Sequence, residues 1–193
     1  MISKKGERNM LLGIILISIA VILVIWGIGM YNGFIRMKNR IEEAFATMDV
    51  YLKKRYDLIP NLVETVKGYA AHESGTLSAV IQARNIASGA NTIEGRIEGE
   101  TMLNGALKNL FAVAEAYPDL KANANFLDLQ AQLRSMEDEI AQSRKYYNAV
   151  VKEFNTKTEA FPSNLIAGIF HFERRKLFEV NEEAEREAVP VHF

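Results

Sequence analysis

The chain has 193 residues, a formal net charge of −1 at pH 7 and no cysteine. The absence of a basic excess argues against nucleic acid as a partner, and the lack of cysteine excludes disulfides, thiolate metal sites and cysteine nucleophiles. A chain of this length has room for one well-packed domain besides a membrane-spanning segment.

The first predicted element is a transmembrane helix over residues 10–30, preceded by a short polar tail over residues 1–9. At about 1.5 Å per residue this apolar run gives a helix of roughly 31 Å, which matches a bilayer core of about 30 Å. Trp26 and Tyr31 lie near its far end, where amphipathic rings favour the membrane interface. The run is longer than the apolar part of a signal peptide and no A-x-A-like site follows, so we expect an uncleaved anchor.

Basic residues flank this run on both sides. The preceding ones are Lys4, Lys5 and Arg8, and the following ones are Arg36, Lys38 and Arg40. A second cluster, Lys53 to Arg55, lies further along the chain. The numbers of basic residues on the two flanks are nearly equal. If the second cluster is counted, the positive-inside rule slightly favours a cytoplasmic C-terminal part.

Residues 31–172 are predicted to form a helical bundle, because apolar residues recur there at alternating spacings of four and three. Such a seam is typical of a helix packed on other helices. The three seams, in which Arg55 and Ser143 are the polar members, are Ile41, Phe45, Met48, Leu52, Arg55, Ile59, Leu62, Val66 and Tyr69; Leu103, Leu107, Leu110, Ala114 and Tyr117; and Phe126, Leu129, Leu133, Met136, Ile140, Ser143, Tyr147, Val150 and Phe154. Pro60 falls inside the first seam and should remove one backbone hydrogen bond and kink the helix.

Turn signals divide this region into segments of similar length. Breaks near His72, at Tyr117-Pro118-Asp119 and at Pro162 leave residues 31–71, 73–116 and 122–161, each of about 40 residues or roughly 60 Å of helix. A weaker break near Gly89, followed by a helix start at Thr92, leaves open whether the middle segment is one helix or two. Short connections force neighbouring helices to alternate in direction.

The predicted fold is therefore all-α, with an N-terminal transmembrane helix followed by an elongated antiparallel up-and-down four-helix bundle. After the last long segment, a short apolar stretch from Leu165 to Phe172 is expected to pack across the bundle or to lie at the membrane surface. Residues 173–193 form a predicted acidic C-terminal tail.

Signatures of catalysis are missing from the sequence. His72-Glu73 begins like the zinc motif H-E-x-x-H, but Thr76 occupies the position of its second histidine. The other histidines lack acidic partners at helical spacing, and no nucleophile elbow, Walker A motif or dinucleotide fingerprint is present. We therefore predict no metal, no cofactor, no catalytic residue and no enzymatic activity.

The densest polar stretch is Lys53 to Leu62. Arg55 occupies a seam position, so its buried guanidinium must pair with a carboxylate, for which the candidates are Asp57, Glu115, Asp128 and Glu137. A functional interpretation of the same stretch is a polar groove at the Pro60 kink, offered to a partner protein or ligand. Residues around the Tyr-Pro-Asp turn form either a lock between helices or an exposed recognition loop. The candidate interaction surface is accordingly Arg55, Asp57, Asn61, Glu115, Asp119 and Lys121.

These residues lie in motifs that resemble the LemA family of bacterial membrane proteins. The resemblance covers almost everything after the anchor. The motifs are Asp49-Val50, the run from Leu52 to Tyr69, His72-Glu73, Ala83-Arg84, the run from Ala114 to Asn123, Asn125-Phe126, Leu129-Gln130, Leu133, Arg144, Tyr146 or Tyr147 with Asn148, Phe154-Asn155 and Phe161 to Asn164. One departure is Phe45, where the family pattern favours tryptophan; an aromatic ring is kept and only an indole N–H is lost.

The resemblance implies one N-terminal transmembrane helix with its short N-terminus outside, and an antiparallel four-helix bundle in the cytoplasm. It implies a location in the bacterial cell membrane and brings no established activity or catalytic residues. We therefore expect a non-enzymatic, membrane-tethered interaction or scaffold protein. The alternative is a membrane-tethered sensor that binds a small ligand in a polar groove near Pro60. Expected partners are membrane lipid around the N-terminal helix and unidentified proteins but no nucleic acid; homo-oligomers remain an open alternative.

Overall fold

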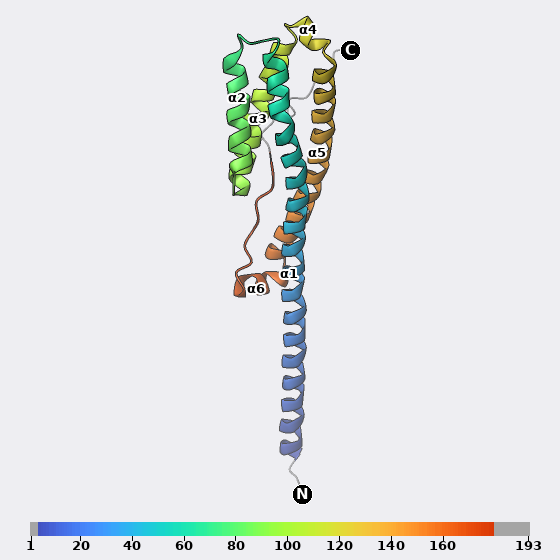
Figure 1. The fold of residues 1–193 in the computed structure, drawn as a ribbon. Coiled ribbons are helices and arrows are strands. Elements are labelled where there is room, and N and C mark those ends of the chain that lie inside the picture. The colour runs from blue at the N-terminus through green and yellow to red at the C-terminus, as the bar shows by residue number, and fades with distance from the viewer. Residues whose placement is uncertain (1–3, 180–193) are drawn as a thin grey trace, which may run out of the picture. The chain divides into compact units, whose positions relative to one another are not determined.

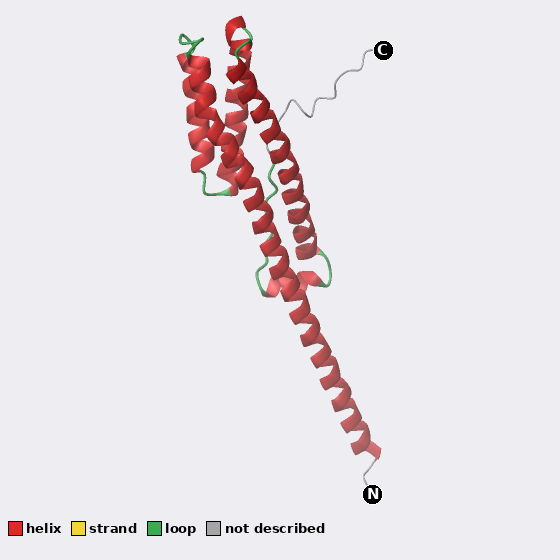
Figure 2. Cartoon of the chain, turned by 45° about the vertical axis from the view of Figure 1, so that its right-hand side comes forward, coloured by secondary structure: helices red, strands yellow, loops and turns green. Residues whose placement is uncertain are grey.

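The computed structural model describes residues 4–179, and within them every regular element is a helix (Figures 1 and 2). The helices are α1 (Lys4–Lys67), α2 (Ser74–Gly89), α3 (Ile93–Ala114), α4 (Pro118–Lys121), α5 (Ala124–Glu159) and α6 (Ser163–Ile169). The all-α prediction is confirmed. Most of the predicted acidic tail, residues 180–193, lies outside the described residues.

The chain divides into two compact units. Unit 1 comprises Met1–Glu42 with Val150–Arg175, and unit 2 comprises Glu43–Ala149 with Lys176–Phe193. The two longest helices, α1 and α5, each contribute residues to both units.

In unit 1 the first part of α1 is long and apolar enough to cross a membrane. Its most apolar stretch has a mean hydropathy of 3.0, and none of that stretch is buried inside the protein. The side chains of Leu16 and Ile17 are 67% and 66% exposed. The helix begins at Lys4, so the last residues of the predicted polar tail are already helical.

Aromatic contacts join α1 to the C-terminal part of unit 1. The buried Phe34 ring packs edge-on against Phe154 at 5.9 Å and stacks on Phe172 at 4.7 Å between centroids. The side chain of Asn155 donates to the Arg175 carbonyl and accepts from its N–H, at 2.9 and 2.8 Å. The chain that follows α6 is thus held along α5 by apolar and polar contacts together.

Unit 2 buries most of the predicted seam residues, and Tyr69, which is 43% exposed, is an exception. Met48, Leu52, Ile59, Leu62 and Val66 of α1 are at most 1% exposed, and Leu103, Leu107 and Leu110 of α3 are similarly covered. The seam of α5 is buried at Phe126, Leu129, Leu133, Ile140 and Tyr147. Burial of these stripes, at about 25 cal/mol per Å² of apolar surface, is the main force holding the helices together.

The middle segment consists of two helices, α2 and α3, which settles the question left open by the sequence. The Oγ1 atom of Thr92 accepts a hydrogen bond from the N–H of Gly95 at 3.1 Å and caps α3. Gly99 allows close approach of the two helices, because a Cβ there would lie 2.5 Å from the Cα of Ala87.

Helix α1 continues through Pro60 to Lys67. Proline has no N–H, so the carbonyl of Tyr56, four residues earlier, loses its helical donor. In the structure that carbonyl accepts a hydrogen bond from Nε of Arg84 on α2, at 3.3 Å. A side chain from a neighbouring helix thus replaces the backbone donor that proline removes.

Candidate functional site

Arg55 links three helices inside unit 2. Its side chain is buried, with a 4% exposed fraction. Nη1 donates to Oε2 of Glu100 on α3 at 3.0 Å and lies 3.0 Å from Oε2 of Glu137 on α5, while Nη2 donates to Oδ1 of Asn104. Arg55 is thus paired with carboxylates, and Glu137 is the one of the four candidates that it contacts. Glu100 and Asn104 were not predicted, and the carboxylates of Asp57, Glu115 and Asp128 are not its partners.

Glu100 is the most deeply buried acid of this site, with a 2% exposed fraction. Its second carboxylate oxygen accepts a hydrogen bond from the hydroxyl of Tyr56. Burial raises the pKa of Glu100, and this outweighs the opposite effect of the neighbouring Arg55 guanidinium. Burial and the Glu100 charge together raise the pKa of Tyr56, so its hydroxyl remains a donor.

A second ion pair lies beside the first. Nη2 of Arg96 on α3 is 3.1 Å from Oδ1 of Asp49 on α1, and Asp49 also pairs with Lys53 at 2.7 Å. The Arg96 guanidinium lies 6.0 Å from the centroid of the Tyr56 ring, within cation–π range. Among the described residues, Nε and Nη1 of Arg96 have no hydrogen-bond partner although the side chain is buried.

We call this set of side chains the charge cluster. Its members are Asp49, Arg55, Tyr56, Arg96, Glu100, Asn104 and Glu137. The Arg55 guanidinium and the Tyr56 hydroxyl occupy the two carboxylate oxygens of Glu100, and no group of three or more metal-ligating side chains is found within the described residues. The arrangement is suited to fixing helices to each other, because removal of one member leaves another charge buried without its partner.

The other predicted site residues lie on the surface of unit 2. Asp57 and Asn61 are exposed on α1, and Glu115 and Lys121 form an exposed ion pair at the connection between α3 and α4. Asp119 is exposed within α4. The six predicted residues therefore do not form one interaction surface, because Arg55 is buried and the other five are exposed.

Hydrogen bonds at the α3–α4 connection favour the interpretation of this turn as a lock between helices. The Tyr117 hydroxyl donates to Oε1 of Glu73 at 3.3 Å, and Nδ2 of Asn123 donates to the Tyr69 hydroxyl at 2.9 Å. Both bonds connect the turn to chain segments more than forty residues away. The two bonds fix the position of the turn relative to those segments.

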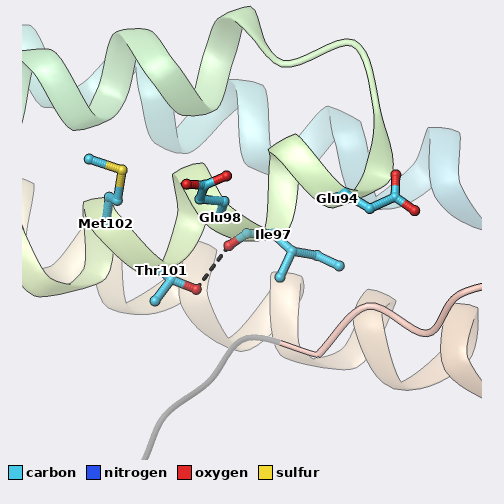
Figure 3. A pocket seen from close by; sticks show the side chains of 5 residues that line it. All are labelled: Glu94, Ile97, Glu98, Thr101 and Met102. Atoms are coloured by element: carbon cyan, nitrogen blue, oxygen red, sulfur yellow. Dashed lines mark hydrogen bonds between the residues drawn. The ribbon is translucent and has the colours of Figure 1, made fainter.

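A surface pocket is present on one face of α3. It is lined by Glu94, Ile97, Glu98, Thr101 and Met102 (Figure 3). The Thr101 hydroxyl donates to the carbonyl of Ile97 at 2.9 Å and is therefore satisfied within the helix. All five side chains come from a single helix, and this site does not include Pro60, where the sequence predicted a groove.

Arg96 and Glu100 are the functional residues that sequence reasoning missed. The spacing that marks Leu103, Leu107 and Leu110 as a seam extends backwards by one helical turn to Glu100 and by a further turn to Arg96. A charged residue at a seam position was thus a usable signal, as it was for Arg55.

The fold and the site define a helical protein with an exposed apolar span at its N-terminus and an ion-pair cluster in its interior. It belongs to the LemA family, whose sequence model matches residues 44–193. The resemblance seen in the motifs is confirmed.

Three relatives illustrate the relationship. Protein LemA of Metamycoplasma hominis is 27% identical over 162 residues, which cover 80% of this chain and 71% of that protein. Magnetosome protein MamQ 2 of Paramagnetospirillum magneticum is 26% identical over 175 residues, covering 77% of this chain and 64% of the relative. Magnetosome protein MamQ of Magnetospirillum gryphiswaldense is 24% identical over 200 residues, covering 90% and 73%. With the apolar span of α1, these matches indicate a membrane-associated protein of the LemA family.

Proposed function

We propose that the chain is a single-pass protein of the bacterial cell membrane whose helical part binds other proteins and catalyses no reaction. The observation that supports this most is α1 itself. One continuous helix, Lys4–Lys67, carries both the apolar span and the Arg55 side chain of the charge cluster. The chain thus joins a membrane segment covalently to a helical unit fixed from inside by ion pairs.

The charge cluster supports a scaffold better than a reaction centre. Its buried carboxylate is held by Arg55 and Tyr56, and its guanidinium groups face carboxylates, so no group of the pair Arg55–Glu100 is left to act on a substrate. The exposed polar residues of the same stretch, Asp57 and Asn61, are available to a partner.

Site-specific photo-crosslinking in intact cells tests the proposal. A photoreactive side chain at Asp57 or Asn61 should give a discrete protein adduct in the membrane fraction. The matched control is Arg134, an exposed residue of α5. Asp57→Lys should abolish the adduct formed from position 61 while the far-ultraviolet circular dichroism stays unchanged. Identical adducts from position 134, or none from 57 and 61, would contradict a specific protein partner at this surface.

The alternative, a sensor for a small ligand near Pro60, is favoured by one feature of Arg96. Its buried guanidinium keeps two donors without a hydrogen-bond partner among the described residues, beside the ring of Tyr56. A buried donor without a partner costs about 1–3 kcal/mol, which an anionic ligand would recover. Inorganic phosphate and acetate should then raise the melting temperature of the full chain in detergent micelles. The shift should vanish in Arg96→Leu; equal shifts in both proteins would rule out this site.

A further inference from the structure

Four apolar side chains around α6 are exposed in unit 1. Phe161, Leu165, Ile169 and Phe170 are 80%, 54%, 67% and 51% exposed. Leu165 and Ile169 lie one helical turn apart on the open side of α6, whereas Ile166 and Ala167 are buried. We call the four exposed side chains the α6 apolar face.

An apolar cluster of this kind is unfavourable in water. Exposed apolar residues scattered singly are ordinary, but four of them within residues 161–170, beside the buried Ile166 and Ala167, are typical of an interaction surface. At about 25 cal/mol per Å² of apolar surface removed from water, covering these side chains would be favourable.

The position of α6 along α1 indicates what covers this face. A Cβ added to Gly27 would lie 3.7 Å from Cδ1 of Ile166, and the Tyr31 ring lies 4.7 Å from the ring of Phe170. Both contacts are within unit 1, where α6 lies against α1 (Figure 1). Gly27 and Tyr31 stand at the C-terminal end of the apolar run, the level at which a spanning helix reaches the lipid headgroups.

The charge of the surrounding chain fits the same location. Residues 31–42 and 150–175, the part of unit 1 beyond the apolar run, hold seven Lys or Arg residues against four Glu residues, although the whole chain has a net charge of −1. Arg174 and Arg175, shortly after α6, are exposed. Basic residues at this level are attracted to anionic headgroups by about 1 kcal/mol each.

We propose that the α6 apolar face is inserted into the headgroup–acyl boundary of the bilayer that α1 crosses. This inference rests on the proposed anchoring of the chain by α1. The chain then contacts the membrane twice, across the bilayer through α1 and in its surface layer through α6. A short amphipathic element with apolar residues on the lipid side and basic residues around it is a known mode of interfacial binding.

Lipid-depth fluorescence tests the proposal, and the natural lack of cysteine makes single labelling sites straightforward. A bimane probe is attached at Leu165→Cys or Ile169→Cys in the full chain, reconstituted in vesicles of phosphatidylcholine and phosphatidylglycerol. The quenchers are iodide in the water and two phosphatidylcholines, one with its doxyl group near the top of the acyl chain for positions 165 and 169 and one with it deep in the chain for position 22. Glu153→Cys, exposed on α5 within unit 1, is the water-facing control, and Ile22→Cys in the apolar run reports insertion of α1.

We expect the probes at Leu165 and Ile169 to lose emission with the doxyl lipid and to be protected from iodide, and the probe at Glu153 to behave in the opposite way. Strong iodide quenching at 165 and 169 with lipid quenching at 22 would overturn the inference while leaving the anchor intact. Protection from iodide without lipid quenching would show that a second copy or another protein covers the face, and would overturn it too. Loss of lipid quenching at 22 would instead overturn the anchoring itself.

Discussion

Arg55 is the residue whose removal should destabilise the fold most. It touches partners on α3 and α5 from a position on α1, and its loss leaves the carboxylate of Glu100 buried without its cation. Breaking a buried pair from one side costs about 3–5 kcal/mol, so Arg55→Met should lower the free energy of unfolding by that amount. Urea denaturation of the full chain in detergent micelles, followed by circular dichroism, measures it. Lys54→Met, an exposed neighbour, is the control; equal losses in the two variants would remove the special role of Arg55.

Glu100 gives the cluster a pH dependence of defined sign. Its pKa in the folded chain is raised above its ordinary value of 4.5, so the folded state binds the proton more tightly than the unfolded state. The stability contributed by protonation is complete below the ordinary pKa and is lost as the pH rises through the raised pKa. The variant Glu100→Gln has no titratable group at this position and is therefore the reference for the wild type.

The free energy of unfolding of the wild type minus that of Glu100→Gln should therefore be largest in acid and should fall as the pH rises towards neutrality. Denaturation of both proteins at a series of pH values checks this. Carboxylates outside the charge cluster act on both proteins alike and cancel in the difference. Glu137 does not cancel, because it shares the Arg55 guanidinium with Glu100, so the comparison is made in a Glu137→Gln background. A difference that grows with pH would show that attraction by Arg55 outweighs the burial of Glu100.

At the scale of elements, the packing of α2 on α3 depends on one glycine. A methyl group at Gly99 would come within 2.5 and 2.8 Å of the Cα and N of Ala87, which are backbone atoms that cannot turn away. Gly99→Ala should therefore cost about 1–3 kcal/mol through separation of the two helices. Gly105→Ala, in the same helix with open space around it, should instead stabilise by about 0.5–1 kcal/mol, because alanine is the better helix former. Thermal unfolding of both variants separates steric from propensity effects, and stabilisation by both would contradict the close approach.

The bond between Arg84 and the Tyr56 carbonyl should depend on Pro60. In the wild type, Arg84→Met removes the donor that replaces the missing proline N–H. In a Pro60→Ala background the backbone donor returns, so the same substitution should cost less. A double-mutant cycle measured by urea denaturation should give a coupling of about 0.5–1.5 kcal/mol, the net value of one hydrogen bond. Additive effects would show that Arg84 acts on α1 in some other way.

The helices and their buried faces follow from periodicity, whereas their polar contacts do not. The seams from Ile41, Leu103 and Phe126 onward predicted most of the buried residues, because a stripe of apolar side chains on a helix packs against its neighbours; Tyr69 at the end of the first seam is exposed. The seam position of Arg55 also implied that its guanidinium pairs with a carboxylate, and Glu137 is one of its two carboxylate partners in the structure. Spacing along one helix says nothing about the register of another, so Glu100 and Asn104 could be identified only in three dimensions. The close packing that Gly99 permits could likewise be recognised only from the position of Ala87 on the neighbouring helix.

At the scale of the whole molecule, the apolar span makes α1 long and apolar enough to cross a bilayer but does not by itself determine its orientation. Three basic residues precede the span and three follow it, so the difference between the two orientations rests on few charges. The LemA resemblance and the later cluster from Lys53 to Arg55 both favour a cytoplasmic C-terminal part. A reporter fused after Phe193 that is active only in the cytoplasm should therefore be active.

Because the two flanks of the span carry equal numbers of basic residues, the orientation of α1 should change when a few of these charges are removed. Neutralising the C-terminal flank in the triple variant Arg36→Gln, Lys38→Gln and Arg40→Gln should move part of the reporter population to the outside, as positive charges hold a flank on the cytoplasmic side. The matched control neutralises Lys121, Arg134 and Lys145, which lie too far along the chain to influence insertion. Both measurements use paired reporters of opposite sidedness, so a loss of expression is distinguished from a change of orientation. If the reporter of the wild type is found outside the membrane, the partners to look for are surface signals and envelope proteins. If the triple variant keeps the wild-type orientation, the folded helices after the span, rather than its flanking charges, determine the orientation of α1.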